Sequence, residues 1–270
     1  MRRHDGERIL RQRFEDVHGR KLDIDHPKTL TAKLTCWMVA QTRRPDPVFT
    51  ELADKVRVRR YVAERLGDGV LTRMLWNGPD PRAIPFDELP TRYVLKTNNG
   101  SRRVIRVSGE VDREAVIAQL QRWIRSNYYW QDREPQYLRI PPLALVEEWL
   151  DDGMPAGPLD YRFWCFHGEP AVIQVADHVH SINPYYDPSW RRLDLVTYAP
   201  IRPDADVPRP RFLSDMLRAA GTLSRGFGFV RVDLHCLPDR FVFGEMTFTP
   251  AAGTLRFHPD EWDRRLGALW

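Results

Sequence analysis

The sequence predicts an α+β fold in which two lobes follow a helical region. Three observations lead to this prediction. Apolar residues recur at helical spacing up to about residue 66, whereas short strands with a period of two begin at Pro90 and alternate with helices. Residues 229–250 then have the pattern of a single β-hairpin. We therefore expect a helical N-terminal region over residues 1–66, a smaller lobe over residues 67–147 and a larger lobe over residues 148–270.

The composition is that of an ordinary globular protein and argues against several functional classes. Hydrophobic residues make up 42% and charged residues 29% of the 270 residues. The net charge is only +4, and basic residues alternate with acidic ones, unlike the one-signed stripe of a nucleic-acid-binding protein. The three cysteines have no metal-binding spacing, and no run of about 18 apolar residues suggests a membrane span. We expect a soluble cytoplasmic protein with no nucleic-acid partner and no transmembrane segment.

Four helical patterns occupy the first third of the chain. Gly19 and Gly67 are end signals for two of the helices, and Asp46 is an N-cap that precedes a first-turn proline. The predicted helices cover residues 6–18, a segment after Pro27, a segment that starts at Pro47, and residues 55–66. The last of these has a basic side, for which a solvated face is the ordinary explanation.

Shorter elements follow. The Asn99-Gly100 dipeptide predicts a tight turn, since both positions tolerate positive φ, between strands over residues 91–96 and 102–107. The other expected elements are helices over residues 112–126 and 211–224, strands over residues 143–150, 161–167 and 171–176, and a proline-rich loop over residues 200–210.

The hairpin near the end of the sequence carries one acid on each apolar strand, Asp233 and Glu245. If residues 238–240 form its turn, the two acids pair directly and point to the same face. Like charges in that position are destabilising, and a divalent cation that also binds phosphate oxygens would remove the conflict. The alternative is a solvated face on which Arg231 and Arg240 balance the acids.

A second polar constellation follows Lys96, which ends a strand. The turn after it consists of Thr97, Asn98, Asn99, Gly100 and Ser101. Such a turn can wrap an anion with its backbone N–H groups while the ammonium group adds a positive charge, although a plain surface hairpin has the same composition. The phosphate-loop motif is absent, and Gly226-Phe-Gly228 precedes a strand where a dinucleotide fingerprint must precede a helix.

These features occur in a fixed order: the Lys96 turn, an apolar strand that ends in Glu147-Glu148, and the acidic hairpin. In four segments the chain resembles the TupA-like ATP-grasp family of cell-surface polymer biosynthesis, namely residues 54–62, 89–101, 160–168 and 229–253. The resemblance extends from about residue 10 to Trp262-Asp263 and Leu266-Gly267. It implies an ATP-grasp fold, with two α+β lobes that hold ATP between them, and a carboxylate ligase that forms an acylphosphate and releases ADP.

The resemblance also implies roles for individual residues. Lys96 would contact the ATP phosphates, and Arg231 would neutralise the transferring phosphoryl group or the acylphosphate. The remaining assignments are a mobile phosphate loop at Asn98, Asn99, Gly100 and Ser101, an adenine-binding strand end at Glu147, Glu148 and Leu150, further nucleotide contacts at Asp160 and Arg162, and Mg²⁺ ligands at Asp233 and Glu245.

Several positions depart from the family pattern or have two interpretations. Thr247 stands where many ATP-grasp enzymes have a metal-binding Asn, so it would contact metal-bound water or simply pair in the strand. Arg162 replaces a usual Lys, and Asp177-His178 replaces Asp-Arg. His178 and His180 form either a metal-binding pair or a polar strand edge. The aromatic residues at 128–130 and 185–190 would either form the floor of an acceptor site or pack in the core.

The sequence thus predicts an ATP- and Mg²⁺-dependent ligase that joins a carboxylate-bearing and an amine-bearing substrate through an amide or peptide-like bond. The substrates would be small molecules, peptides or saccharides of cell-surface polymer or secondary-metabolite biosynthesis. One alternative is an ATP-dependent kinase of a sugar or polymer hydroxyl. Another is a non-catalytic nucleotide-binding or glycosyltransferase-associated accessory protein. The helical N-terminal region is a candidate surface for homodimer contacts.

Overall fold

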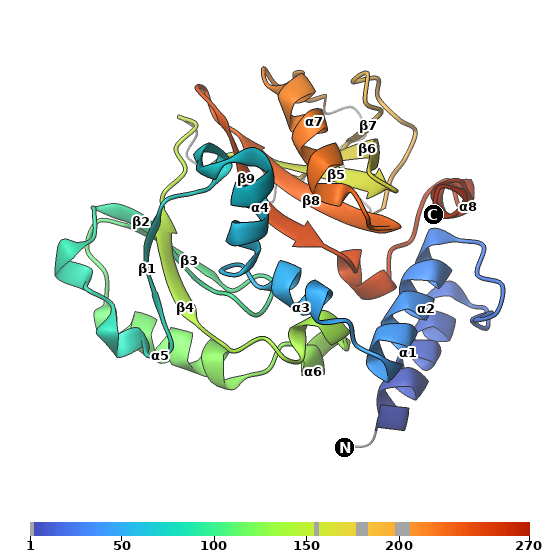
Figure 1. Cartoon of the computed structure of the whole chain (residues 1–270), viewed down its shortest axis with the longest axis horizontal. Helices are drawn as coiled ribbons and strands as arrows, with labels where there is room; N and C mark the ends of the chain where they lie inside the picture. Colours follow the sequence, from blue (N-terminus) through green and yellow to red (C-terminus); the bar gives the residue numbers. More distant parts are fainter. Residues whose placement is uncertain (1–2, 154–156, 177–182, 198–205) are drawn as a thin grey trace. The chain divides into compact units, whose positions relative to one another are not determined.

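The computed structural model describes residues 3–153, 157–176, 183–197 and 206–270. The chain divides into two compact units (Figure 1). Unit 1 combines Met1–Pro45 with Asp152–Trp270, and unit 2 is the continuous segment Asp46–Asp151. This division differs from the expected one, because the first two helices belong to unit 1 and the next two belong to unit 2. Over the described ranges, no helix combines the length and the apolar character that crossing a bilayer requires.

Unit 2 contains a four-stranded antiparallel sheet in the order β1-β4-β2-β3. Helix α5 packs on it, and the core joins Leu120 of this helix to Leu95 and Val146 of the central strands. The elements are α3 (Pro47–Ala53), α4 (Val58–Leu66), β1 (Met74–Gly78), β2 (Arg92–Thr97), β3 (Val104–Ser108), α5 (Arg113–Arg125), α6 (Tyr129–Asp132) and β4 (Ala144–Glu148).

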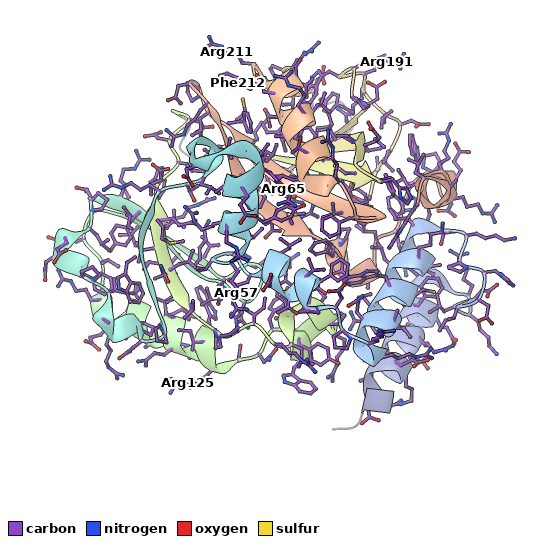
Figure 2. All side chains as sticks on the ribbon, in the orientation of Figure 1. Arg57, Arg65, Arg125, Arg191, Arg211 and Phe212 are labelled. Carbon is purple, nitrogen blue, oxygen red and sulfur yellow. The ribbon has the colours of Figure 1, made fainter. Side chains whose placement is uncertain are left out.

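Unit 1 contains a five-stranded antiparallel sheet in the order β7-β6-β5-β8-β9. Its elements are α1 (Arg3–His18), α2 (Leu30–Arg43), β5 (Asp160–Phe166), β6 (Glu169–Ala176), β7 (Tyr185–Tyr186), α7 (Leu213–Ser224), β8 (Phe229–Cys236), β9 (Phe241–Thr247) and α8 (Glu261–Ala268). Helix α7 lies against β5, β6 and β8 (Figure 1), and Figure 2 draws the side chains on these elements. These strands and helices confirm the expected α+β class.

Helices from the two ends of the chain pack together in unit 1. Asp263 of α8 accepts hydrogen bonds from the main-chain N–H (2.9 Å) and the hydroxyl (2.6 Å) of Thr31, in the first turn of α2. Gly267 lies so close to this segment that an added Cβ would stand 2.5 Å from the main-chain oxygen of Lys28. The Trp262-Asp263 and Leu266-Gly267 segment therefore fixes the start of α2.

The β8–β9 hairpin has the expected pairing but a different turn. Asp233 pairs with Glu245, whereas Leu234 pairs with Phe243, so Gly244 is the extra residue of a β-bulge. The loop is one residue longer than expected, since Leu237 donates its main-chain N–H to the oxygen of Arg240 (2.7 Å). The longer loop and the bulge compensate for each other, so the two acids still face each other.

The expected tight turn at Asn99-Gly100 is wrong. Lys96 is the last residue of β2 that pairs with β3, at Val104, whereas the pairing with β4 on the other edge of β2 continues to Thr97. Residues 97–103 form the longer connection, in which the positive φ is at Arg102 (59°). The side chain of Asn98 holds this connection away from a tight turn, because it bonds Asp54 and the main chain of Pro141 and Leu143.

The aromatic segments pack mainly in the core. Tyr185 and Tyr186 are 0% and 1% exposed, and Tyr128 and Tyr129 are also buried. This confirms the packing interpretation for these four residues, whereas Trp130 is 48% exposed.

Candidate active site

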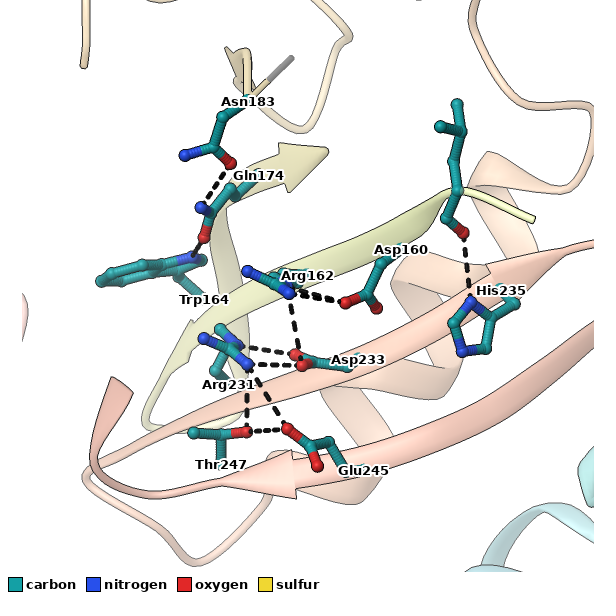
Figure 3. A network of polar contacts seen from close by, with 11 residues as sticks. Asp160, Arg162, Trp164, Gln174, Asn183, Arg231, Asp233, His235, Glu245 and Thr247 are labelled. Carbon is teal, nitrogen blue, oxygen red and sulfur yellow. Dashed lines mark hydrogen bonds and ion pairs between the residues drawn. The ribbon is translucent and has the colours of Figure 1, made fainter. Parts of the chain in front are cut away.

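One face of the sheet in unit 1 gathers charged side chains from three neighbouring strands (Figure 3). In an antiparallel sheet, residues that pair directly point to the same side. Arg162 of β5 pairs with Asp233 of β8, which pairs with Glu245 of β9. The alternation along each strand adds further members to this face: Asp160, Arg231, His235 and Thr247.

Arg231 lies at the centre of this cluster. Its Nε and Nη2 donate to the two carboxylate oxygens of Asp233, at 2.7 and 2.5 Å. The same Nη2 donates to the hydroxyl of Thr247 (3.2 Å) and lies 3.6 Å from a carboxylate oxygen of Glu245. Asp233 is only 2% exposed, so the solvated-face alternative is wrong for this residue.

With all of its groups ionised, the cluster would carry one more negative than positive charge. Arg162 pairs with Asp160 at 2.8 Å and lies 3.8 Å from Asp233, so two guanidinium groups face the three carboxylates of residues 160, 233 and 245. Burial raises the pKa of Asp233 to about 7, with Asp160 and Glu245 adding to the effect and Arg231 opposing it. A further cation would therefore be favoured at this face.

The donor set fits a hard divalent cation that is completed by other oxygens. Asp233 and Glu245 supply carboxylate oxygens, which Mg²⁺ prefers. Among the residues that the structure describes, no group of three or more His, Cys, Asp and Glu side chains could hold a metal. Such a cation would thus need oxygens from a ligand such as a phosphate. Thr247 donates its hydroxyl to Glu245 (3.0 Å), so it orients that carboxylate.

Unit 2 brings together Lys96 and Glu147, which are both predicted nucleotide-binding residues. The ammonium group of Lys96 donates to Oε2 of Glu147 at 2.7 Å. Glu148, the next residue of β4, instead accepts from the main-chain N–H of Arg73 (2.8 Å). The contact between Lys96 and Glu147 follows from register, since Lys96 and Val94 of β2 pair with Leu145 and Glu147 of β4.

Two residues that the sequence did not point to complete this contact, Arg59 and Thr72. The hydroxyl of Thr72 donates to Oε1 of Glu147 (3.0 Å), and Nη1 of Arg59 lies 3.6 Å from the same oxygen. Burial raises the pKa of Glu147, but Lys96, Thr72 and Arg59 together outweigh it and hold this pKa below the ordinary value. Glu147 is therefore a buried, ionised carboxylate.

The predicted phosphate loop is held by side chains of its own unit. The amide group of Asn98 donates to Asp54 (3.0 Å) and to the main-chain oxygen of Pro141 (2.9 Å), and its oxygen accepts from the N–H of Leu143 (2.8 Å). Lys55 donates to the main-chain oxygen of Gly100 (2.7 Å). The amide of Asn98 thus has a structural role, which leaves the backbone of the loop and Lys96 as the groups suited to an anion.

The neighbouring residues of this loop are also anchored. Asn99 is 3% exposed and its Oδ1 accepts from Arg103 (3.3 Å), while Ser101 bonds the hydroxyl of Tyr128. Leu150 follows β4 and is partly exposed. Asp177, His178 and His180 lie outside the described residues.

The chain is similar to several solved structures. An ATP-grasp ligase PsnB complexed with precursor peptide PsnA2 and AMPPNP is 14% identical, with a TM-score of 0.41 over 81% of this chain and 57% of that one. D-alanine–D-alanine ligase from Bacillus anthracis complexed with ATP is 14% identical, with a TM-score of 0.44 over 73% of this chain and 54% of that one. The chain therefore spans little more than half the length of these proteins.

Comparison with curated proteins found no match. The sequence profile of one family, described as TupA-like ATPgrasp, matches residues 32–270. This match includes every predicted site residue of both units. The chain therefore belongs to the TupA-like ATP-grasp family.

Proposed function

We propose that this protein is an ATP- and Mg²⁺-dependent ligase that activates a carboxylate as an acylphosphate and transfers the acyl group to an amine. The observation that carries the proposal is the buried cluster around Arg231, which joins two facing carboxylates to a guanidinium group and contains more carboxylates than guanidinium groups. In a member of the ATP-grasp family, this combination suits the binding of a metal-bound phosphate group.

The cluster of unit 1 would hold the metal and the reacting groups. Asp233 and Glu245 would bind Mg²⁺, which when bound neutralises charge on phosphate oxygens. Arg231 presents N–H groups in a rigid fork, which suits a negative charge that develops on the phosphoryl or acyl group. Arg162 and Asp160 lie beside this fork and are proposed as nucleotide contacts.

The cluster of unit 2 is proposed to bind nucleotide phosphates. Lys96 would bind phosphate oxygens, together with backbone N–H groups of residues 98–101. Glu147, Glu148 and Leu150 are proposed at the adenine, although Glu147 also holds Lys96 in the structure without ligand. We propose small molecules, peptides or saccharides of cell-surface polymer or secondary-metabolite biosynthesis as substrates, on the family resemblance.

The proposal is tested by incubating the protein with ATP, Mg²⁺ and a panel of carboxylates and amines. We expect substrate-dependent release of ADP and free phosphate, together with a product whose mass is that of the two substrates less water. Asp233→Asn should abolish turnover, while circular dichroism shows a folded protein. Phosphate retained on an acceptor hydroxyl would identify a kinase instead. The absence of ADP release with every substrate would refute the ligase proposal.

A further inference from the structure

The segment at residues 54–62 resembles the family pattern but has no role in the reaction proposed above. In the structure it contacts both nucleotide-binding features of unit 2. Asp54 and Lys55 hold the loop after Lys96, through Asn98 and Gly100. Arg59, in the first turn of α4, reaches Glu147. The contact of Arg59 is the more informative, because it brings a second positive charge to Glu147.

Arg59 occupies a position that helix stability does not explain. It is the second residue of α4, whose first turn contains no acidic residue. The positive end of a helix dipole disfavours a cation there. The helix nevertheless directs this guanidinium group inward, where Nη2 donates to the main-chain oxygen of Thr72 (2.6 Å) and Nη1 approaches Glu147. By contrast, the side chain of Arg60 is 81% exposed and lies 3.8 Å from Glu64 of the same helix.

Glu147 therefore has two cationic neighbours, one on each carboxylate oxygen. Lys96 contacts Oε2 (2.7 Å), while Arg59 (3.6 Å) and the hydroxyl of Thr72 (3.0 Å) are on the side of Oε1. The side chain of Glu147 is only 7% exposed, so this carboxylate needs a partner at all times. Lys96 and Arg59 are similarly exposed, at 28% and 21%, but Arg59 is also held by the main-chain oxygen of Thr72 at 2.6 Å. Lys96 is therefore the partner that can turn toward a ligand.

We propose that Arg59 is a positioning residue that keeps Glu147 neutralised and thereby allows Lys96 to leave it for an anionic ligand. If Lys96 were the sole partner, its departure would leave a buried carboxylate uncompensated. With Arg59 and Thr72 in place, Lys96 exchanges one negative partner for another. The inference rests on the proposed function only in taking the anion to be an ATP phosphate.

The exchange can be measured first without any ligand, as the rate at which an amine-acylating reagent labels Lys96, determined by mass spectrometry. The exposed Lys21 serves as internal reference. Arg59→Gln should slow the labelling of Lys96 severalfold, since Glu147 then depends on it alone. Arg60→Gln is the matched control in the same helical turn and should leave the rate within about twofold.

The second measurement is the affinity for ATP, by titration calorimetry, in a double-mutant cycle with Glu147→Gln. Arg59→Gln should weaken ATP binding roughly tenfold when Glu147 is present, and by less than about twofold in the Glu147→Gln background. If Arg59 only tied α4 to Thr72, its replacement would weaken ATP binding by the same factor in both backgrounds. Equal losses, or unchanged labelling of Lys96, would overturn the inference.

Two further outcomes are decisive. If Arg59→Gln does not fold, Arg59→Lys takes its place. Labelling of Lys96 at the native rate in that variant supports the charge role. Labelling severalfold slower than in the native protein opposes it. If labelling responds as expected but the native protein binds no ATP, the role of Arg59 toward Lys96 stands and the proposed nucleotide function fails.

Discussion

The main chain of Asp233 lies directly against Gly244, so that a Cβ added to Gly244 would stand 3.0 Å from the main-chain oxygen of Asp233. The same Cβ would lie 3.3 Å from Nε2 of His235. This contact is tighter than side chains normally tolerate, and it occurs at the bulge that sets Asp233 opposite Glu245. The pairing of the two acids therefore depends on a residue without a side chain.

Replacing Gly244 with Ala should consequently disturb the proposed metal site as well as the hairpin. We expect the free energy of unfolding to fall by about 1 kcal/mol, because β9 must shift to relieve the contact. The stabilisation by Mg²⁺ with ATP, measured as the rise in Tm, should fall too. Gly69→Ala is the control, since a Cβ there meets nothing within 4 Å. A native-like Gly244→Ala variant would show that the bulge does not need glycine.

Asp54→Ala should be more destabilising than the loss of an ordinary helix cap. Asp54 is 1% exposed and accepts from the N–H of Val56 (2.9 Å) and from Asn98. We expect a loss of about 2–3 kcal/mol in urea unfolding, because the main-chain N–H of Val56 and the amide group of Asn98 lose their buried acceptor together. Asp46→Ala removes an exposed cap of α3 and should lose only about 1 kcal/mol. Equal losses would mean that the contact with Asn98 contributes nothing.

Gly267→Ala should destabilise unit 1 strongly. The new Cβ would stand 2.5 Å from the oxygen of Lys28 and 2.7 Å from the nitrogen of Leu30, which are both main-chain atoms. Main-chain atoms cannot rotate away, so α8 must separate from α2, at a loss of about 2–4 kcal/mol in unfolding free energy. Amide hydrogen exchange should show the faster opening in α2 and α8. An unchanged exchange rate in α2 would contradict the packing described here.

The stability contributed by Glu147 should depend on pH in the acidic range. Since its partners lower its folded pKa below the ordinary 4.5, the contribution is present above 4.5 and is lost as pH falls through the folded pKa. The destabilisation caused by Glu147→Gln should therefore be largest near about pH 7 and shrink below about pH 4. Urea unfolding of both proteins across this range measures the difference. A difference that grows toward acid would indicate that Glu147 is neutral in the folded protein.

The sequence predicted those features that depend on local pattern. The α+β class, the helix start at Asp46 and the pairing of Asp233 with Glu245 all follow from periodicity and turn signals. The prediction nevertheless assumed a shorter turn. A longer loop combined with a bulge gives the same pairing of the two acids, so the sequence pattern does not distinguish the two arrangements. The Asn99-Gly100 signal failed because residues far away in the sequence, Asp54, Pro141 and Leu143, hold the side chain of Asn98 and with it the loop.

The features that sequence reasoning missed depend on contacts between distant segments. Arg59 and Glu147 are far apart in sequence and meet only because α4 and β4 fold into one unit. A basic helical face is usually solvated, so nothing in the local pattern distinguishes Arg59 from Arg60. Likewise, the contact of Asp263 with Thr31 explains why the first two helices join unit 1. The hydrophobic periodicity of the sequence gives no sign of this contact.

The order of units along the chain has a consequence for synthesis on the ribosome. Unit 2 is continuous, so all of its strands are available once residue 151 has emerged. Helix α2, although made before these strands, must wait for α8 to pack against its first turn. During that interval Leu30 and Leu34, which are fully buried in the finished protein, have no partner from the second half of unit 1. We expect this early helix to be the part of the nascent chain that depends most on chaperones.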